Sequence, residues 1–261
     1  MDPLAAFRLD GRVALVSGGG GAIGAALAEA LSAAGARIVA ASLHEGHAQA
    51  TADRIIAAGG QAMAVGADAT READAERVVT GALERFGRLD IVVNAVGGGA
   101  GKVLFDAQAY PREAWDWIME LNLRSAVVMT QAAVRAMIAA GHGGRVVNIT
   151  SVRAQLGIDA GYSAYVAAKG AMASLTRQWA TEWAKHAITV NAIAPTFVDT
   201  PQVASLLADP GFKAGIVDRV PLHRIGRTDD LVGAVIFFAS DASSFVTGQN
   251  LGVDGGLTIT Q

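Results

Sequence analysis

Cysteine is absent from this sequence of 261 residues. Its absence excludes disulfide bonds, thiolate metal sites and a cysteine nucleophile. Charge is sparse as well, since 17% of the residues are charged, the formal net charge is −3 and the pI is about 5.9. Domains that bind nucleic acid carry a basic surface, so this charge balance predicts no nucleic-acid partner.

Long apolar runs are missing too. No stretch of about eighteen uninterrupted apolar residues occurs, which predicts no membrane span and no membrane partner. The first ten residues contain no apolar run of signal-peptide length, so we expect a cytoplasmic protein. His44 and His47 have no third ligand nearby in the sequence, and we therefore expect no resident metal site.

The chain also lacks internal repeats, low-complexity segments and linkers. Its 31 glycines are scattered, and 52% of its residues are hydrophobic, which is enough for a sizeable core. A chain of this length and composition is expected to form one domain over residues 1–261.

Short apolar runs alternate with longer amphipathic segments, and this alternation predicts an α/β fold with a parallel sheet. Strands are predicted at residues 12–17, 37–42, 61–66, 89–94, 144–151, 188–194 and 251–256. Helices are predicted at residues 25–34, 46–58, 71–86, 111–140, 162–186 and 229–239. The irregular segment at about 196–225 contains three prolines and is long enough to predict a substrate loop.

A glycine-rich turn joins the first predicted strand to the first helix. Gly19, Gly21 and Gly24 fit G-x-G-x-x-G, whereas Ser17, Gly18, Ala22 and Gly24 fit a T-G-x-x-x-G-x-G pattern with two replacements. Strand, glycine turn and helix form the context of a dinucleotide fingerprint, in which the pyrophosphate lies at the helix N-terminus. The turn predicts a dinucleotide cofactor, while the residues alone leave its register open.

The ends of the next strands bear on cofactor choice. Ser42 stands where NAD enzymes usually carry an acid, and no arginine follows that would bind a 2′-phosphate, although His44 could contribute. NADP and NAD both stay open as cofactors, with NADP slightly favoured.

Asp68 is suited to accept a hydrogen bond from adenine, or equally to cap the helix that starts near Arg71. Small residues from Asn94 onward indicate backbone close to a ligand.

Tyr165 and Lys169 are the strongest catalytic candidates. They stand four residues apart in a predicted helix, so they share one face, and an ammonium beside a phenol lowers its pKa. Ser151 ends a predicted strand, where open α/β sheets bind ligands, and no G-x-S-x-G elbow supports a serine hydrolase there. Asn122 falls inside a helix, where it could bend the helix or hold a water. Lys102 is a weaker candidate for substrate contact.

Together these motifs resemble the short-chain dehydrogenase/reductase family over essentially the whole chain. The resemblance implies a single-domain Rossmann fold: a doubly wound, seven-stranded parallel sheet with helices on both faces. It also implies an NAD(P)-dependent oxidoreductase that interconverts a secondary alcohol and a ketone, commonly as a homotetramer. The matching positions are residues 17–24, Asn94-Ala95, Asn122, Ser151, Tyr165, Lys169, 195–200 and 253–256.

The resemblance assigns a role to each matching residue. Tyr165 is the general acid or base, Lys169 holds the nicotinamide ribose and lowers the phenol pKa, Ser151 orients the substrate oxygen, and Asn122 supports a proton path through water. Expected cofactor contacts are Ser17, Gly18, Gly21, Ile23, Gly24, Ser42, Asp68, Ala69, Asn94, Ala95, Tyr165, Lys169, Pro195, Val198 and Thr200. Departures from the family pattern are Ala22, Val93, Val96 and Thr196, none of which removes a catalytic group.

Within the family, residues 150–153 and 194–198 look most like the sugar-acid and polyol dehydrogenases of the gluconate 5-dehydrogenase group. Arg153 is then expected to bind a substrate carboxylate through a bidentate contact. A 3-oxoacyl-carrier-protein reductase shares the same catalytic set and remains an alternative. A non-catalytic dinucleotide-binding sensor or scaffold is another, since fold alone does not prove chemistry. Some relatives bind Mg²⁺ at the C-terminal carboxylate, here that of Gln261, which we do not expect in this chain.

Overall fold

The computed structural model describes residues 4–260, and its centre is a seven-stranded parallel sheet with the strand order β3-β2-β1-β4-β5-β6-β7. Burial on both faces explains why most strands read as continuous apolar runs. The predicted doubly wound Rossmann fold is confirmed. The strands are β1 Val13–Ser17, β2 Arg37–Ser42, β3 Ala62–Gly66, β4 Ile91–Asn94, β5 Gly144–Ile149, β6 Ile188–Pro195 and β7 Asn250–Val253.

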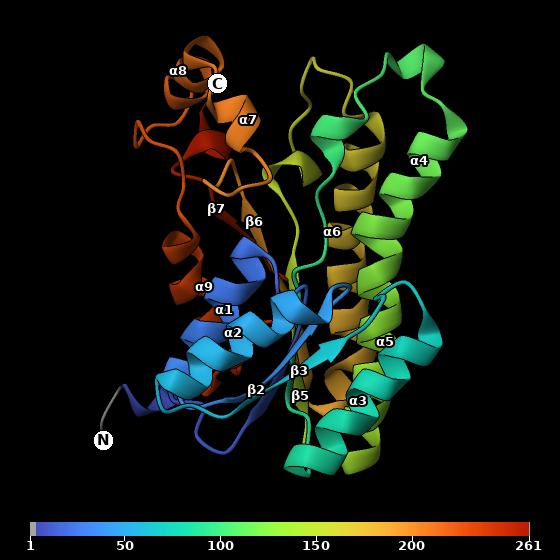
Figure 1. Cartoon of the computed structure of the whole chain (residues 1–261), viewed down its shortest axis with the longest axis vertical. Helices are drawn as coiled ribbons and strands as arrows, with labels where there is room; N and C mark the ends of the chain where they lie inside the picture. Colours follow the sequence, from blue (N-terminus) through green and yellow to red (C-terminus); the bar gives the residue numbers. More distant parts are fainter. Residues whose placement is uncertain (1–3, 261) are drawn as a thin grey trace.

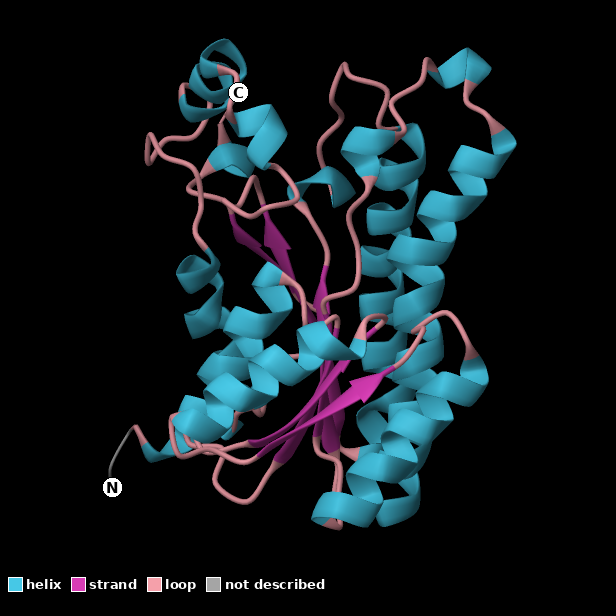
Figure 2. Cartoon of the chain, in the orientation of Figure 1, coloured by secondary structure: helices cyan, strands magenta, loops and turns pink. Residues whose placement is uncertain are grey.

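Helices cover both faces of this sheet (Figure 1). One hydrophobic core joins the sheet to α1, α2 and α9, and a second joins it to α3, α5 and α6. Figure 2 shows the strands enclosed between these two helical layers. The helices are α1 Ala22–Ala33, α2 Glu45–Ala57, α3 Glu72–Phe86, α4 Arg112–Met119, α5 Ser125–Ala140, α6 Ser163–Trp183, α7 Ala204–Leu207, α8 Pro210–Val217 and α9 Val232–Ala239. Within residues 4–260, no helix has the length and apolar character of a membrane span.

The strand order reverses between β1 and β4, which are neighbours in the sheet. Chain segments leaving these two strands diverge to opposite sides, and open α/β sheets bind ligands in the crevice that results. Ser17 is paired with Asn94 at the carboxyl ends of the two strands. The predicted glycine turn and the small residues after Asn94 therefore meet at this crevice.

Two predicted helices differ from the observed ones. Helix α1 begins at Ala22 rather than Ala25, because the backbone is already helical directly after Gly21. The helix predicted at 111–140 is instead α4 and α5 joined by a π-helical segment, Glu120–Arg124, with Asn122 at its centre. A π-helical segment inserts one residue into the helical ladder, and such segments are frequent at functional sites.

The predicted substrate loop contains α7 and α8, which lie above the carboxyl edge of β6 and β7 in Figure 1. Asp209 caps α8 by accepting hydrogen bonds from the backbone of Gly211 and Phe212. Ile216 and Val220, at the end of the loop, pack against Val152 in a small apolar cluster. This contact anchors the base of the loop to the chain that leaves β5.

Candidate active site

The glycine turn after β1 is closely packed against the turn after β4. Gly18 has a φ of +82°, and a Cβ atom there would lie 2.7 Å from the carbonyl carbon of Ala95 and from the backbone nitrogen of Val96. A Cβ atom on Gly24 would overlap the Gly18 carbonyl. Gly24 belongs to both registers, so Gly18 and Gly21 decide between them. A Cβ atom on Gly21 would meet nothing closer than the Gly18 carbonyl oxygen at 3.3 Å, whereas Gly18 has both a positive φ and a backbone contact, which favours the T-G-x-x-x-G-x-G register.

Two connected cavities run along the carboxyl edge of the sheet. A smaller one of about 270 Å³ and a larger one of about 670 Å³ share wall residues from the glycine turn and from the segment after β4. The smaller cavity contains the predicted residues Ser17, Gly18, Gly21, Ser42, Asp68, Ala69 and Ala95. The larger contains Gly21, Ile23, Gly24, Ala95, Ser151, Arg153, Tyr165, Lys169, Pro195, Val198 and Thr200.

The lining of these cavities fits a dinucleotide. The glycine turn that leads into α1 forms part of both cavity walls, and backbone N–H groups at a helix N-terminus suit a phosphate. Ser42 lies at the wall of the smaller cavity without an acidic neighbour in that wall other than Asp68. Apart from Asp68, no carboxylate of this lining opposes a 2′-phosphate near Ser42, so the slight preference for NADP is retained.

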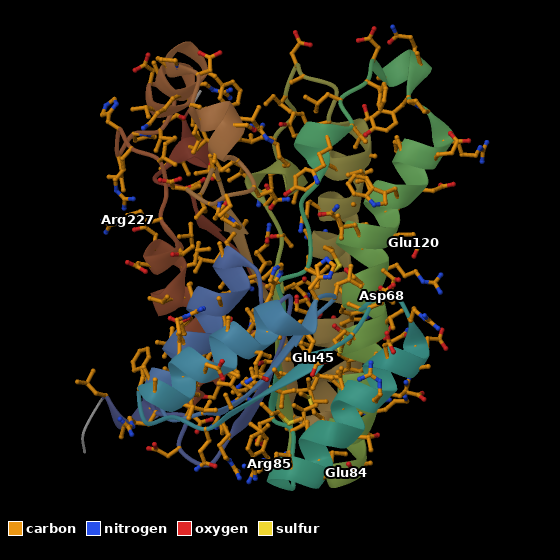
Figure 3. All side chains as sticks on the ribbon, viewed as in Figure 1. Glu45, Asp68, Glu84, Arg85, Glu120 and Arg227 are labelled. Carbon is orange, nitrogen blue, oxygen red and sulfur yellow. The ribbon has the colours of Figure 1, made fainter. Side chains whose placement is uncertain are left out.

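Asp68 occupies the edge predicted for it but does not cap a helix. Its Oδ1 accepts hydrogen bonds from the backbone nitrogen and hydroxyl of Thr70, at 3.0 and 2.7 Å. Helix α3 starts later and has Arg71 at its N-cap, so the capping alternative is wrong. Figure 3 shows Asp68 at the end of α3 opposite Glu84 and Arg85, beside the carboxyl edge of the sheet. Adenine recognition by this carboxylate remains a prediction.

Asn94 lies beneath the cavities rather than in their walls. Its Nδ2 donates to the Thr130 hydroxyl at 2.7 Å and to Asn148 Oδ1 at 2.8 Å, and Asn148 in turn donates to Thr176. These buried amides and hydroxyls tie β4 and β5 to α5 and α6. The geometry gives Asn94 a supporting position outside both cavity walls, whereas its neighbour Ala95 lines both cavities.

Asn122 joins the π-helical segment to the turn after β4. Its Oδ1 accepts from the Gly98 backbone nitrogen at 2.7 Å, and its Nδ2 donates to the Gly98 carbonyl at 3.0 Å and to the Ile118 carbonyl at 3.1 Å. Gly98 has a φ of +113°, a conformation that favours glycine. The asparagine therefore fixes the backbone of the cavity wall, and its predicted role in a water path remains a prediction.

Ser151, Tyr165 and Lys169 converge at one point of the larger cavity. Ser151 follows β5, while Tyr165 and Lys169 lie on successive turns of α6. Lys169 Nζ donates to the Ile149 carbonyl at 2.9 Å and lies 5.7 Å from the centre of the Tyr165 ring. Ser151 Oγ accepts from the Arg153 backbone nitrogen at 3.1 Å, which orients its hydroxyl beside the phenol.

The electrostatics of this group differ from the expectation. Burial raises the pKa of Tyr165, and the neighbouring Ser151 hydroxyl and the Arg153 cation offset that effect only in part. Burial also lowers the pKa of Lys169 to about 8. The expected lowering of the phenol pKa is therefore wrong, because loss of hydration outweighs the opposing effects of Ser151 and Arg153.

Three wall residues were not among the predicted site residues. The Gln202 amide covers Gly98, so that a Cβ atom on Gly98 would collide with it. Tyr162 contacts Tyr165 edge to face, with ring centres 6.2 Å apart. His47 lines both cavities and packs beside Gly20, whereas the exposed His44 does not line them. Only Tyr162, three residues before Tyr165, was open to prediction from helical spacing.

Comparisons with known proteins agree with this geometry. The family model described as enoyl-(acyl carrier protein) reductase matches residues 20–258. The chain is 38% identical over 254 residues to 2-dehydro-3-deoxy-D-gluconate 5-dehydrogenase of Escherichia coli, covering 97% of this chain and 98% of that protein. It is 36% identical over 251 residues to 3-oxoacyl-[acyl-carrier-protein] reductase of the same organism, covering 96% and 99%.

A solved structure extends the similarity to three dimensions. The gluconate 5-dehydrogenase of Burkholderia cenocepacia, crystallised with NADP and tartrate, superposes with a TM-score of 0.91 and is 38% identical, covering 99% of each chain.

Proposed function

The chain belongs to the short-chain dehydrogenase/reductase family, and from that premise we propose that it is an NADP-dependent dehydrogenase that interconverts a secondary alcohol of a sugar acid or polyol with the corresponding ketone. The observation that carries the proposal is the convergence of Ser151, Tyr165 and Lys169 in the larger cavity. This cavity continues into the smaller one, a glycine-lined cleft whose wall contains Gly18, Gly20, Gly21 and Gly97.

The chain's own residues supply proton transfer and orientation. A bound nicotinamide supplies or accepts the hydride. Tyr165 gives a proton to the substrate oxygen in reduction and removes it in oxidation, and Ser151 holds that oxygen beside the phenol. Lys169 lines the same cavity as Tyr165 and would hold the nicotinamide ribose. Asn122, through its bonds to Gly98, keeps the cavity wall in place and supports a water path to Lys169.

Related proteins support the proposed cofactor and substrate class. The B. cenocepacia structure contains NADP and tartrate, and the E. coli relative is a gluconate-type 5-dehydrogenase. This chain has no acid at the end of β2, where an NAD enzyme usually carries one. We therefore assign NADP as the preferred cofactor and a hydroxylated acid or polyol as substrate. A cytoplasmic homotetramer is the expected form.

A 3-oxoacyl-carrier-protein reductase is the second candidate, because a relative with that activity is 36% identical. A non-catalytic dinucleotide-binding protein is the third. It is the weaker proposal because every catalytic position is filled by the residue that the chemistry needs.

The test is reduction of NADP and of NAD in the presence of a panel of sugar acids and polyols. Turnover with gluconate-like acids, absent in Tyr165→Phe, is the expected result. Turnover only with 3-oxoacyl thioesters and NADPH favours the second candidate. Cofactor binding without turnover of any of these, and with no difference in the Tyr165→Phe variant, contradicts the enzymatic proposal.

A further inference from the structure

The larger cavity has basic side chains in its wall and no acidic ones, within the part of the chain that the structure describes. His47, Lys102, Arg153 and Lys169 line it, while no aspartate or glutamate does. Lys169 belongs to the catalytic group and His47 to the glycine-lined cleft. Arg153 lies on the segment after β5, together with Ser151, and is the basic residue of the wall that was expected to contact substrate rather than cofactor.

Arg153 is buried without an acidic partner. Its residue is only 6% exposed, and its Nη1 donates to the Gly157 carbonyl at 2.8 Å. No described carboxylate forms an ion pair with it, and no described residue accepts a hydrogen bond from its Nε or Nη2. A buried guanidinium without a counter-ion is costly, so its retention points to an anion that enters with the ligand.

The contact with Gly157 determines how that anion would bind. Because Nη1 is held by a backbone carbonyl, the Nε–Nη2 edge is the side of the guanidinium left for a ligand. Two parallel N–H donors on that edge match the two oxygens of a carboxylate. The backbone nitrogen of the same residue donates to Ser151 Oγ, so the anion and the reacting oxygen would be held by neighbouring atoms of one turn.

We propose that the Nε–Nη2 edge of Arg153 binds the carboxylate of the substrate, so that the enzyme selects hydroxy acids and keto acids over their uncharged analogues. This inference rests on the proposed dehydrogenase function and narrows its substrate class from sugar acids or polyols to sugar acids. It also separates the protein from reductases of neutral thioesters. The nearby Arg219 lies outside the cavity wall and adds to the unneutralised positive charge around Arg153.

The test compares D-gluconate with D-gluconamide, which has the same hydroxyl groups and no charge. The wild-type enzyme is expected to prefer the acid by about 10- to 100-fold in kcat/KM, the range of a hydrogen bond to a charged group. Arg153→Gln is expected to bring this ratio close to one, mainly by raising KM for D-gluconate. Arg153→Lys keeps the charge but loses the two-pronged edge, and we expect an intermediate ratio.

Arg219→Gln is the matched control, since it removes a neighbouring charge without changing the cavity wall, and it should retain the preference for the acid. Thermal unfolding reports whether each variant is folded. If Arg153→Gln does not fold, the acid-to-amide ratio of Arg153→Lys is compared with that of the wild type instead. Equal kcat/KM values for acid and amide in the wild type overturn the inference but leave the dehydrogenase function intact. A preference that persists in folded Arg153→Gln overturns it equally.

If neither compound is turned over, gluconate is not a substrate, and the binding of D-gluconate then tests the proposed role of Arg153. Calorimetric titration of D-gluconate into the NADPH complex supports the inference if Arg153→Gln binds at least about tenfold more weakly than the wild type. Equal binding, or no binding to either protein, overturns it.

Discussion

Tyr165 lies in surroundings that keep its phenol protonated at neutral pH, since burial raises its pKa. Alcohol oxidation needs the phenolate as base, whereas ketone reduction needs the phenol as acid. We therefore expect kcat/KM for oxidation to rise by about tenfold per pH unit from pH 7 to 9, while kcat/KM for reduction stays level. Measurements of kcat/KM for oxidation and for reduction over this pH range test the prediction. Oxidation that is independent of pH over that range would contradict it.

Lys169 predicts an unusual dependence of stability on pH. Its pKa falls from 10.5 to about 8 on folding, so between these values the unfolded chain binds a proton that the folded chain does not. Stability from this group is therefore poorest below pH 8 and improves as pH rises towards 10.5, by about 1.4 kcal/mol per unit and about 3 kcal/mol in all.

The comparison for Lys169 uses Lys169→Met, which cannot titrate. Urea unfolding between pH 7 and 10 should show the wild type gaining stability relative to this variant as pH rises. The exposed Lys185→Met serves as control and should show no such trend. A constant difference between wild type and Lys169→Met across the range would disprove the expected shift.

At the scale of single residues, the sequence predicted the convergence of Ser151, Tyr165 and Lys169. A strand end and a helical spacing are local properties, and together they placed the three side chains. Gln202 and His47 could not be found in this way, because their positions in the wall depend on the approach of separate loops. The sign of the Tyr165 shift also depends on burial, which a sequence pattern of charges does not report.

The π-helical segment Glu120–Arg124 joins α4 and α5, and its link to Gly98 makes a prediction at the scale of elements. Asn122→Ala leaves both backbone groups of Gly98 without this partner. We expect a loss of about 1–3 kcal/mol in the free energy of unfolding, and a loss of activity because the cavity wall is released.

Urea unfolding and kcat measure the effects of Asn122→Ala. Gln131→Ala, an exposed substitution on α5, is the control and should change stability by no more than about 0.5 kcal/mol. An Asn122→Ala variant that resembles this control in both stability and kcat would show that the link to Gly98 does not support the site.

Most element boundaries agree with the predicted ones within a few residues, because buried parallel strands and their covering helices leave clear apolar patterns. Strand β2 was predicted at its observed bounds. The π-helical segment was not predictable from helical periodicity, since its extra residue is held by Asn122 reaching a turn that is distant in sequence. The early start of α1 was hidden for a related reason: glycines favour no conformation strongly.

For the whole molecule, the glycine-lined cleft predicts that cofactor binding and folding stability are coupled. NADPH at about 100 times its dissociation constant should stabilise the protein by about 2.7 kcal/mol, which corresponds to a rise of about 5–10 °C in Tm. In Gly24→Ala a Cβ atom would overlap the Gly18 carbonyl, and this variant should lose the rise. Thermal scans with and without NADPH measure it. Gly46→Ala, in open space on α2, should retain it, and an equal rise in Gly24→Ala would contradict the assignment.

The doubly wound arrangement of the sheet was expected from the resemblance to a family rather than from the apolar runs themselves. Runs of this kind identify strands but do not say which strands are neighbours, so the reversal between β1 and β4 was not available from local pattern. That reversal creates the crevice in which the two cavities lie. The catalytic residues were thus predictable, while the shared space that the site residues enclose was not.

Charge recognition and proton transfer are encoded in one short stretch of chain, from the end of β5 at Ile149 to Lys169 on α6. The region around Ser42, which faces the smaller cavity, lies more than a hundred positions earlier in the sequence. A recombination crossover between the two would pass on the chemistry and the substrate charge as one unit, while cofactor preference segregated independently. The region around Ser42 and the stretch from Ile149 to Lys169 can therefore have different evolutionary origins within a single chain.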